Sequence, residues 1–265
     1  MPAMKVVILR GGAVQRRAGG LTRADTADSG VCAVGVGDQW VLINVSAAVA
    51  HSLACADPSA GWPGLSDAKV RAIVLTDAQL EHAGGLLGLR RGAPIDLYAT
   101  PAVFEDLSTH LPILPALQHY CGVHWRVIPV SGDQRVGSFQ VEGLPTLEFT
   151  AIATLNPPWP HALEQRAPVV GESIALAVHD HATGRSVFCA PGLTMPGPDE
   201  QAWLRNSDCV LLDEPDPATA ARLGWGEWLD QLPARHKVVL ARDAEAPWLA
   251  GRGIALARDG MEIEL

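Results

Sequence analysis

Three side chains that could carry out chemistry stand close together after an apolar run. The run is Arg71–Leu75, and the side chains that follow it are Asp77, Glu81 and His82. A helical pattern covers Leu80–Arg90. Two carboxylates and an imidazole can bind a divalent metal or transfer protons, and ligands of α/β proteins bind where strands end and loops begin. This corner is therefore the first candidate site. The structural alternative is that Asp77 caps the helix, Glu81 faces solvent and His82 packs in the core.

Short apolar segments surround this corner and must position it. Strands are expected at Lys5–Leu9, Val31–Val36, Trp40–Val45, Arg71–Leu75, Ile95–Ala99, Val123–Val130, Arg135–Val141, Leu147–Ile152, Ser173–His179, Ser186–Cys189, Cys209–Asp213, Lys237–Ala241, Gly253–Ala257 and Met261–Leu265. Turn sequences at Gly35–Asp38, Ser131–Asp133 and Asp180–Gly184 predict hairpins. Helices are expected at Ala47–Cys55, Leu80–Arg90, Thr100–Ser108, Asp199–Asn206 and Pro217–Leu232, and an ordered loop at Thr109–Tyr120.

Strands occur early and late in the chain, with helices interspersed in each half. This pattern predicts two sheets packed face to face with helices outside, an α/β four-layer αββα sandwich. The many hairpin links disfavour a doubly wound parallel sheet. Because no linker is long enough to divide the chain, residues 1–265 are expected to form a single domain.

The composition narrows the class of protein. The 265 residues are 48% hydrophobic and 18% charged, which is typical of a folded chain with a sizeable core. The net charge of −9 argues against nucleic acid and anionic membranes as partners. No segment approaches the roughly 20 apolar residues of a membrane helix. The first residues lack the pattern of a signal peptide, so a cytoplasmic protein is expected.

The five cysteines are scattered, odd in number and free of any C-x-x-C pair. This excludes a disulfide framework and a thiolate zinc cage within the chain. Cys189 and Cys209 lie in apolar runs and are expected to be small core residues.

Several segments, in order along most of the chain, resemble the pyrroloquinoline quinone (PQQ) biosynthesis protein B family, a branch of the metallo-β-lactamase fold. The matching segments are Trp40–Ser46, Val74–Leu87, Glu105–Thr109, Gln118–Trp125, Pro157–His161, Phe188–Leu193 and Asp259–Leu265. The last of these is the most specific.

The resemblance implies a metal motif at the corner described first. The general fold carries His-x-His-x-Asp-His there, and its positions in this chain are Asp77, Gln79, Glu81 and His82. The quinone-biosynthesis branch resembles Asp-x-Glu-x-Asp-His, so Asp77 and His82 match it, whereas Gln79 and Glu81 depart from it. The resemblance thus implies Asp77, Glu81 and His82 as ligands. It also places Asp213 where the fold has a bridging metal aspartate, although Asp213 could equally cap the next helix.

Other positions resemble or depart from the family. His119 and His161 lie in matching segments expected to face the cleft, either as substrate contacts or as buried histidines bonded to a loop carbonyl. The family's cysteine-rich zinc loop is missing, because Gly11–Ser29 contains no cysteine. Ala241 stands where the family has a histidine. The pair His179 and His181 forms an H-x-H without a family match and is expected to be exposed.

Two functions follow from the resemblance. The first is a metal-dependent oxygenase (hydroxylase) in the maturation of PQQ or a related peptide-derived molecule, with His82, Asp77 and Glu81 as catalytic groups. Fe(II) is the implied metal, with Mn or Zn as weaker alternatives. The second is a metal-free degenerate relative, a pseudoenzyme that binds or carries a ligand, a precursor peptide or a partner enzyme. A partner biosynthetic enzyme or a homodimer is compatible with either.

Overall fold

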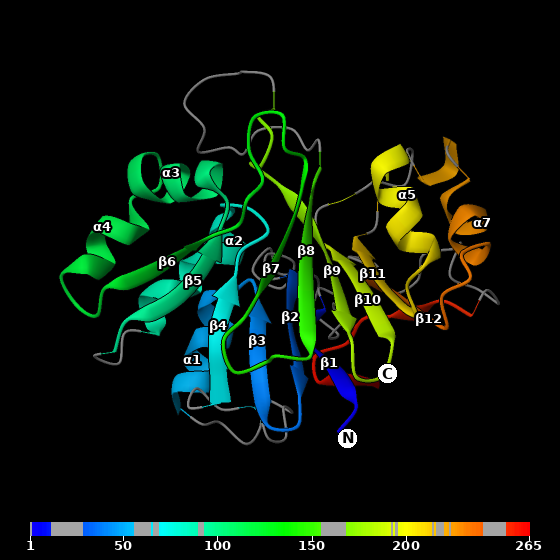
Figure 1. The fold of residues 1–265 in the computed structure, drawn as a ribbon, viewed down its shortest axis with the longest axis horizontal. Coiled ribbons are helices and arrows are strands. Elements are labelled where there is room, and N and C mark those ends of the chain that lie inside the picture. Colours follow the sequence, from blue (N-terminus) through cyan, green and yellow to red (C-terminus); the bar gives the residue numbers. More distant parts are fainter. Residues whose placement is uncertain are drawn as a thin grey trace, which may run out of the picture.

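The fold is built from two mixed sheets. The computed structural model describes residues 2–11, 29–55, 65, 69–89, 93–154, 168–191, 193, 196–213, 215, 220–222, 224–240 and 253–265. The first seven-stranded sheet has the order β14-β1-β2-β3-β4-β5-β6, and the second β13-β12-β11-β10-β9-β8-β7 (Figure 1). In each sheet, one half is antiparallel and the other is parallel.

The strands match the apolar runs of the sequence closely. The first sheet contains β1 (Met4–Gly11), β2 (Ser29–Val36), β3 (Gln39–Ile43), β4 (Val70–Val74), β5 (Ile95–Ala99), β6 (Val123–Val127) and β14 (Met261–Glu264). The second contains β7 (Val136–Gln140), β8 (Leu147–Ala153), β9 (Ile174–Asp180), β10 (Arg185–Ala190), β11 (Cys209–Asp213), β12 (His236–Leu240) and β13 (Ala255–Leu256).

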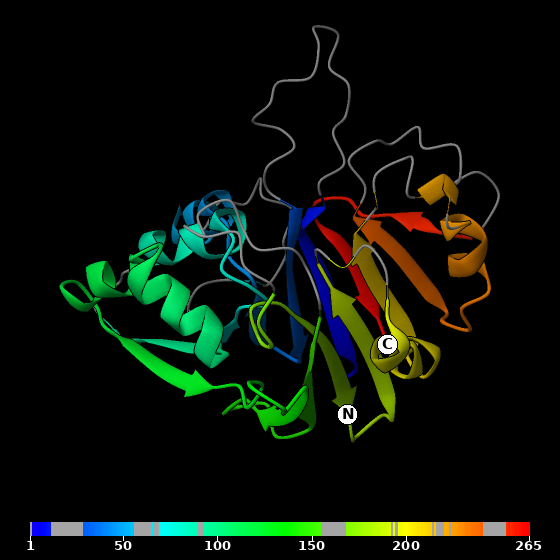
Figure 2. The ribbon, with the colours of Figure 1, turned by 90° about the horizontal axis from the view of Figure 1, so that it is seen from above.

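Helices cover the outer face of each sheet. The outer face of the first sheet packs on α1 (Ala47–Cys55), α2 (Leu80–Ala83), the 3₁₀ helix η4 (Gly84–Gly88), α3 (Pro101–Thr109) and α4 (Ile113–Gln118). The outer face of the second packs on α5 (Pro198–Arg205) and α7 (Trp225–Asp230). The two helical groups lie on opposite sides of the paired sheets (Figure 2). The predicted αββα sandwich is confirmed.

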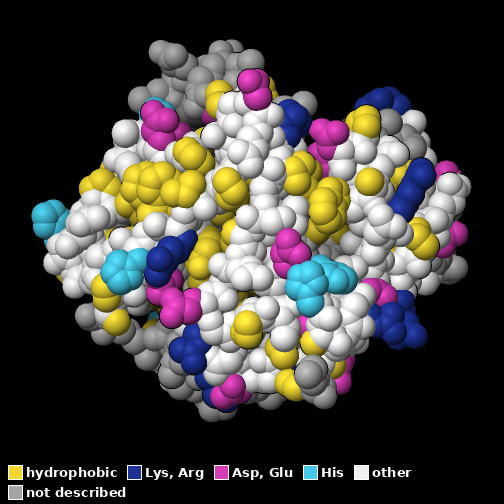
Figure 3. All heavy atoms as spheres, in the orientation of Figure 1, with side chains coloured by type: hydrophobic (Ala, Val, Ile, Leu, Met, Phe, Trp, Pro, Cys, Tyr) yellow, Lys and Arg dark blue, Asp and Glu magenta, His cyan; other side chains and the backbone are white. Residues whose placement is uncertain are grey.

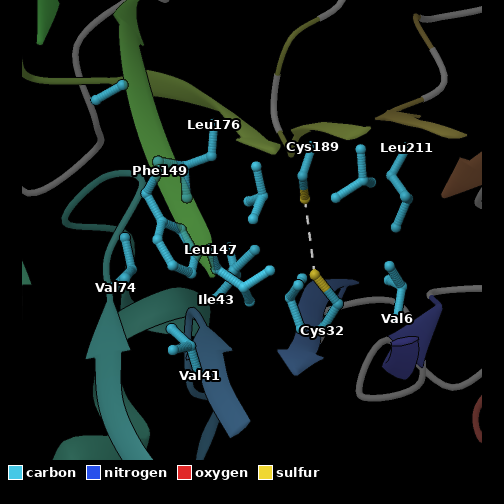
Figure 4. Close-up of a cluster of buried hydrophobic side chains, with 14 of the residues drawn as sticks. Val6, Cys32, Val41, Ile43, Val74, Leu147, Phe149, Leu176, Cys189 and Leu211 are labelled. Atoms are coloured by element: carbon cyan, nitrogen blue, oxygen red, sulfur yellow. Dashed lines mark hydrogen bonds between the residues drawn. The ribbon is translucent and has the colours of Figure 1, made fainter. Parts of the chain in front are cut away.

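The inner faces of the sheets form a continuous apolar layer (Figure 4). Val41, Ile43 and Val74 of the first sheet lie opposite Phe149 and other residues of the second. Each sheet is buried on its inner face by the other sheet and on its outer face by helices, which explains why the strands read as nearly continuous apolar runs. The sheets thereby hold their strand ends, and the loops after them, in one place.

The helix predicted over Leu80–Arg90 is wrong in its length and type. The α-helix ends at Ala83 and continues as a 3₁₀ helix. The cause is a close backbone approach, since a Cβ on Gly85 would lie 2.3 Å from the Ser46 carbonyl oxygen. The Gly85 amide also donates to the Val45 carbonyl at 3.0 Å. The chain tightens here in order to pack against the loop after β3.

Two further predictions were wrong. Thr109–Tyr120, predicted to be a loop, contains the helix α4. Pro115 is compatible with this helix because it lies in the first turn, where a backbone N–H has no partner within the helix. The turn at Ser131–Asp133 does not close a hairpin between β6 and β7. It carries the chain from the first sheet to the second, where β7 pairs with β8.

The surface is mixed in character. On the face shown in Figure 3, acidic and basic side chains are interspersed, and hydrophobic side chains gather near α3 and β6. Val127 is exposed in that region, and the rings of Phe104 and Trp125 stack 3.9 Å apart. Among the described residues, no helix is both long and apolar enough to span a membrane.

Candidate functional site

The candidate site begins where β4 ends. The Leu75 amide donates to the Tyr98 carbonyl at 3.0 Å, which continues the pairing with β5, and the chain then leaves the sheet at Thr76. Asp77 forms an isolated bridge with Ser173, and the Ile174 amide donates to the Thr76 carbonyl at 2.9 Å. The corner is thus held by the second sheet as well as the first.

Asp77 and His82 are brought together by this corner. His82 Nδ1 lies 2.8 Å from both carboxylate oxygens of Asp77. Asp77 is 0% exposed and His82 is 4% exposed. Because an ionised carboxylate only accepts hydrogen bonds, Nδ1 carries the hydrogen and donates it to Asp77. When the ring is neutral, Nε2 is therefore the nitrogen without a hydrogen, and it can accept a proton or bind an electrophile.

The remaining bonds of Asp77 stabilise its charged form. The Gln79 amide donates to Oδ1 at 2.9 Å, and the Thr76 hydroxyl donates to Oδ2 at 3.0 Å. Burial raises the pKa of Asp77, but the nearby charge of His82 and the hydrogen bonds from His82, Gln79 and Thr76 outweigh burial and hold the pKa below its usual value. Asp77 is accordingly an anion at neutral pH that orients His82.

Gly30 and Pro191 border the other nitrogen of the ring. A Cβ built on Gly30 would lie 2.9 Å from His82 Nε2 and 2.8 Å from Pro191 Cβ. Gly30 also has φ +79°, a conformation that favours glycine. Gly30 belongs to β2 and Pro191 follows β10, so one wall comes from each sheet. Gly30 and Pro191 therefore pack closely against the Nε2 side of the ring, where even a methyl group would meet both His82 and Pro191.

Asn44 and Thr76 join this arrangement, and sequence reasoning missed both. Asn44 Nδ2 donates to the Gly30 carbonyl at 3.1 Å and to Thr76 Oγ1 at 2.9 Å. Asn44 Oδ1 accepts the Thr76 amide at 3.0 Å. The signal that could have found Asn44 is its polar side chain inside the apolar stretch from Trp40 to Val45.

The structure does not assemble the full set of predicted metal ligands. Glu81 is half-buried on α2, and Asp213 is half-buried at the end of β11. Across the described part of the chain, no three His, Cys, Asp or Glu side chains lie close enough to hold a metal ion together. Mononuclear iron and zinc sites need at least three protein ligands. The described side chains therefore do not fit such a site, and the ligand roles of Asp77, Glu81, His82 and Asp213 stay predictions.

Of the two histidines predicted to bind substrate, the structure describes only His119, which lies away from this corner. His119 is exposed at the C-terminal end of α4, in the outer helical layer. His161 lies outside the described residues, as does Ala241. Of the H-x-H pair expected to be exposed, His181 is exposed and bonded to Glu148 at 2.9 Å, whereas His179 is half-buried.

Comparisons with known proteins agree with this fold. A family model described as "Beta-lactamase superfamily domain" matches residues 39–240. "Coenzyme PQQ synthesis protein B" of Azoarcus sp. (strain BH72) is 33% identical, over 97% of this chain and 91% of that protein. The protein of the same name from Methylobacillus flagellatus (strain ATCC 51484 / DSM 6875 / VKM B-1610 / KT) is 32% identical, over 94% and 91%.

Solved structures give the same fold. The Zn²⁺-bound PqqB of Methylobacterium extorquens superimposes with a TM-score of 0.72 at 19% identity, over 98% of this chain and 100% of that one. A diphosphatase of the PhnP family superimposes with a TM-score of 0.65 at 16% identity, over 99% of this chain and 97% of that one. The family model and the identities over nearly the whole chain show that this chain belongs to the coenzyme PQQ synthesis protein B family, within the β-lactamase superfamily.

Proposed function

We propose that this protein acts in PQQ biosynthesis, in the cytoplasm, on a small-molecule or peptide-derived precursor. The proposal is supported by the curated relatives, which are named for PQQ synthesis and match over 94–97% of the chain. Such a precursor would be supplied by, or passed to, another enzyme that modifies the same peptide-derived scaffold.

Within this role, we assign the contact with the precursor to His82. The observation that carries the assignment is the pairing of Nδ1 with the buried carboxylate of Asp77 at 2.8 Å. The anion holds the ring in one tautomer and stabilises the imidazolium when Nε2 accepts a proton. PQQ and its precursors carry phenol, quinone and carboxylate groups that can share a hydrogen bond with such a nitrogen. Here Asp77 is a positioning residue and His82 the binding or acid–base group, without a metal.

A second candidate function is the metal-dependent oxygenase. One observation favours it: a carboxylate that accepts the Nδ1 hydrogen of a histidine is the usual outer partner of a metal-binding imidazole. The Zn²⁺-bound relative from Methylobacterium extorquens gives further support. This function would use His82 Nε2, with Glu81 and Asp213 as the other predicted ligands, and Asp77 outside the ligand set. The described side chains provide too few donors around Nε2, so this function ranks second.

One pair of measurements separates the two functions. The first is thermal unfolding with PQQ as the probe in excess chelator, and the second is metal content after anaerobic loading with Fe(II), Mn(II) or Zn(II). A ligand at a hundredfold its dissociation constant stabilises by about 2.7 kcal/mol, or roughly 5 °C in a chain of this size. We expect this shift in wild type, its loss in His82→Gln, and far less than one metal per chain. Stoichiometric metal that His82→Gln removes would establish the second function instead.

A further inference from the structure

We propose that Asn44 is the positioning residue that holds both sides of the His82 imidazole and so selects its tautomer. This inference rests on the proposed role of His82. Asn44 directly follows Ile43, the last residue of β3, and is fully buried.

The backbone of Asn44 is in an unusual conformation. Its φ is +62°, which residues other than glycine adopt rarely and asparagine tolerates best. The backbone N–H of Asn44 donates to the Val74 carbonyl at 2.8 Å and binds the residue to β4. The side chain of Asn44 points toward the corner. Asparagine therefore suits this backbone, and its buried side-chain amide is hydrogen-bonded, as buried polar groups usually are.

On the Nδ1 side of the ring, Asn44 acts through Thr76. The Thr76 hydroxyl has one hydrogen, and two acceptors are in reach: Asn44 Oδ1 at 3.1 Å and Asp77 Oδ2 at 3.0 Å. Because Asn44 Nδ2 already donates to this hydroxyl, and because a carboxylate is the stronger acceptor, the hydrogen goes to Asp77. The result is a directed chain of donors from Asn44 to Thr76 to Asp77, which keeps the Asp77 carboxylate aligned with Nδ1.

On the Nε2 side, Asn44 acts through Gly30. The second hydrogen of Nδ2 goes to the Gly30 carbonyl at 3.1 Å. The Cα of this same Gly30 borders Nε2, where a Cβ would come within 2.9 Å. A single amide group therefore holds the carboxylate that faces one ring nitrogen and the backbone that faces the other. β3 lies between β2 and β4 in the sheet, and this order explains how one side chain can reach both.

An aspartate at position 44 would keep the shape but lose both donors. It could no longer bind the Gly30 carbonyl or donate to Thr76, and the hydroxyl would turn its hydrogen toward the new carboxylate. Asp77 would lose a donor and gain a like-charged neighbour. The position of the Nδ1 hydrogen would then no longer be set by a single arrangement of bonds.

The test is NMR of the imidazole ring nitrogens of His82, assigned with His82→Gln, on the whole chain. In wild type we expect one neutral tautomer with the hydrogen on Nδ1. Asn44→Asp and Thr76→Val should lose this single signature and give exchange between tautomers, while Thr76→Ser, which keeps the hydroxyl, should restore it. The matched control is Thr150→Val, which removes another hydroxyl pair, that of Thr150 with Ser138 at 2.9 Å, on the second sheet.

If Asn44→Asp does not fold, Asn44→Gly keeps the left-handed backbone without the amide and should give the same loss. The proposal is overturned if folded Asn44 and Thr76 variants show the wild-type tautomer, or if Thr150→Val changes it equally. The tautomer is read without ligand or metal. Failure of the proposed function would thus leave this signature intact, and failure of the present proposal would not remove binding of PQQ.

Discussion

Cys32 of β2 and Cys189 of β10 bring their sulfur atoms to 3.6 Å across the interface of the two sheets (Figure 4). Each lies two residues from a wall of the His82 site, since Gly30 precedes Cys32 and Pro191 follows Cys189. The inner apolar layer therefore continues along the chain into both walls of the site.

The burial and the pKa shifts of the cysteines predict the order in which they react with an alkylating reagent. The hydrogen bond with Cys32 and burial raise the pKa of Cys189, and burial raises the pKa of Cys209, so both are thiols at neutral pH. Cys55 is exposed. We expect iodoacetamide to modify Cys55 first and to spare Cys32, Cys189 and Cys209 until urea unfolds the chain. Peptide mass spectrometry of timed samples measures this order. Equal rates at Cys189 and Cys55 in the native protein would contradict the buried sulfur pair.

The Asp77 carboxylate makes stability depend on pH in the acid range. Its folded pKa lies below the ordinary value of 3.8, so its contribution is complete above about pH 4 and is lost as the pH falls through the folded pKa. Asp77→Asn should cost about 2 kcal/mol at neutral pH, because it removes hydrogen bonds to a charged group. The difference in free energy of unfolding between wild type and Asp77→Asn should become smaller below pH 4. Urea denaturation at several pH values measures both effects.

The control for this prediction is Asp38→Asn, which replaces an exposed carboxylate bonded to Gln39. It should leave the free energy of unfolding at neutral pH nearly unchanged. A gap between wild type and Asp77→Asn that stays constant down to pH 3 would show that Asp77 is not paired as described.

Gly30 offers a matched pair of substitutions. Gly30→Ala places a methyl group against His82 and Pro191 in addition to straining a backbone at φ +79°. Gly132→Ala meets nothing within 4 Å and strains a backbone at φ +57° alone. We expect Gly132→Ala to cost about 1 kcal/mol and Gly30→Ala about 2–3 kcal/mol, by urea denaturation. An equal loss of unfolding free energy in the two variants would mean that Gly30 does not pack against the His82 ring.

The sequence predicts the sheets well because burial on both faces makes apolar runs that are hard to mistake. It also places Asp77 and His82 at one corner, since both lie in one short segment, but it does not predict the hydrogen bond between them. It fails where distant backbone decides the outcome. The 3₁₀ turn at Gly85 follows from contact with Ser46, and no local pattern shows that contact.

The partners of His82 were missed for the same reason. Gly30, Asn44 and Pro191 come from separate strands or their ends, and only the packing of two sheets brings them to one ring. By contrast, His119 was singled out from a matching segment, yet it lies on the outer helical layer. A motif identifies residue types, whereas the fold decides which of them meet.

The central claim is that His82, oriented by Asp77, contacts the precursor without a metal. Isothermal titration of PQQ into the whole chain in excess chelator tests it most directly, with His82→Gln as the variant and His181→Gln as the control, because His181 is exposed and bonded to Glu148. We predict binding in wild type and His181→Gln, and affinity lower by about tenfold or more in His82→Gln, as expected for a lost hydrogen bond to a charged group. Equal affinity in all three proteins, or binding that appears only after Fe(II) is added, would contradict the account.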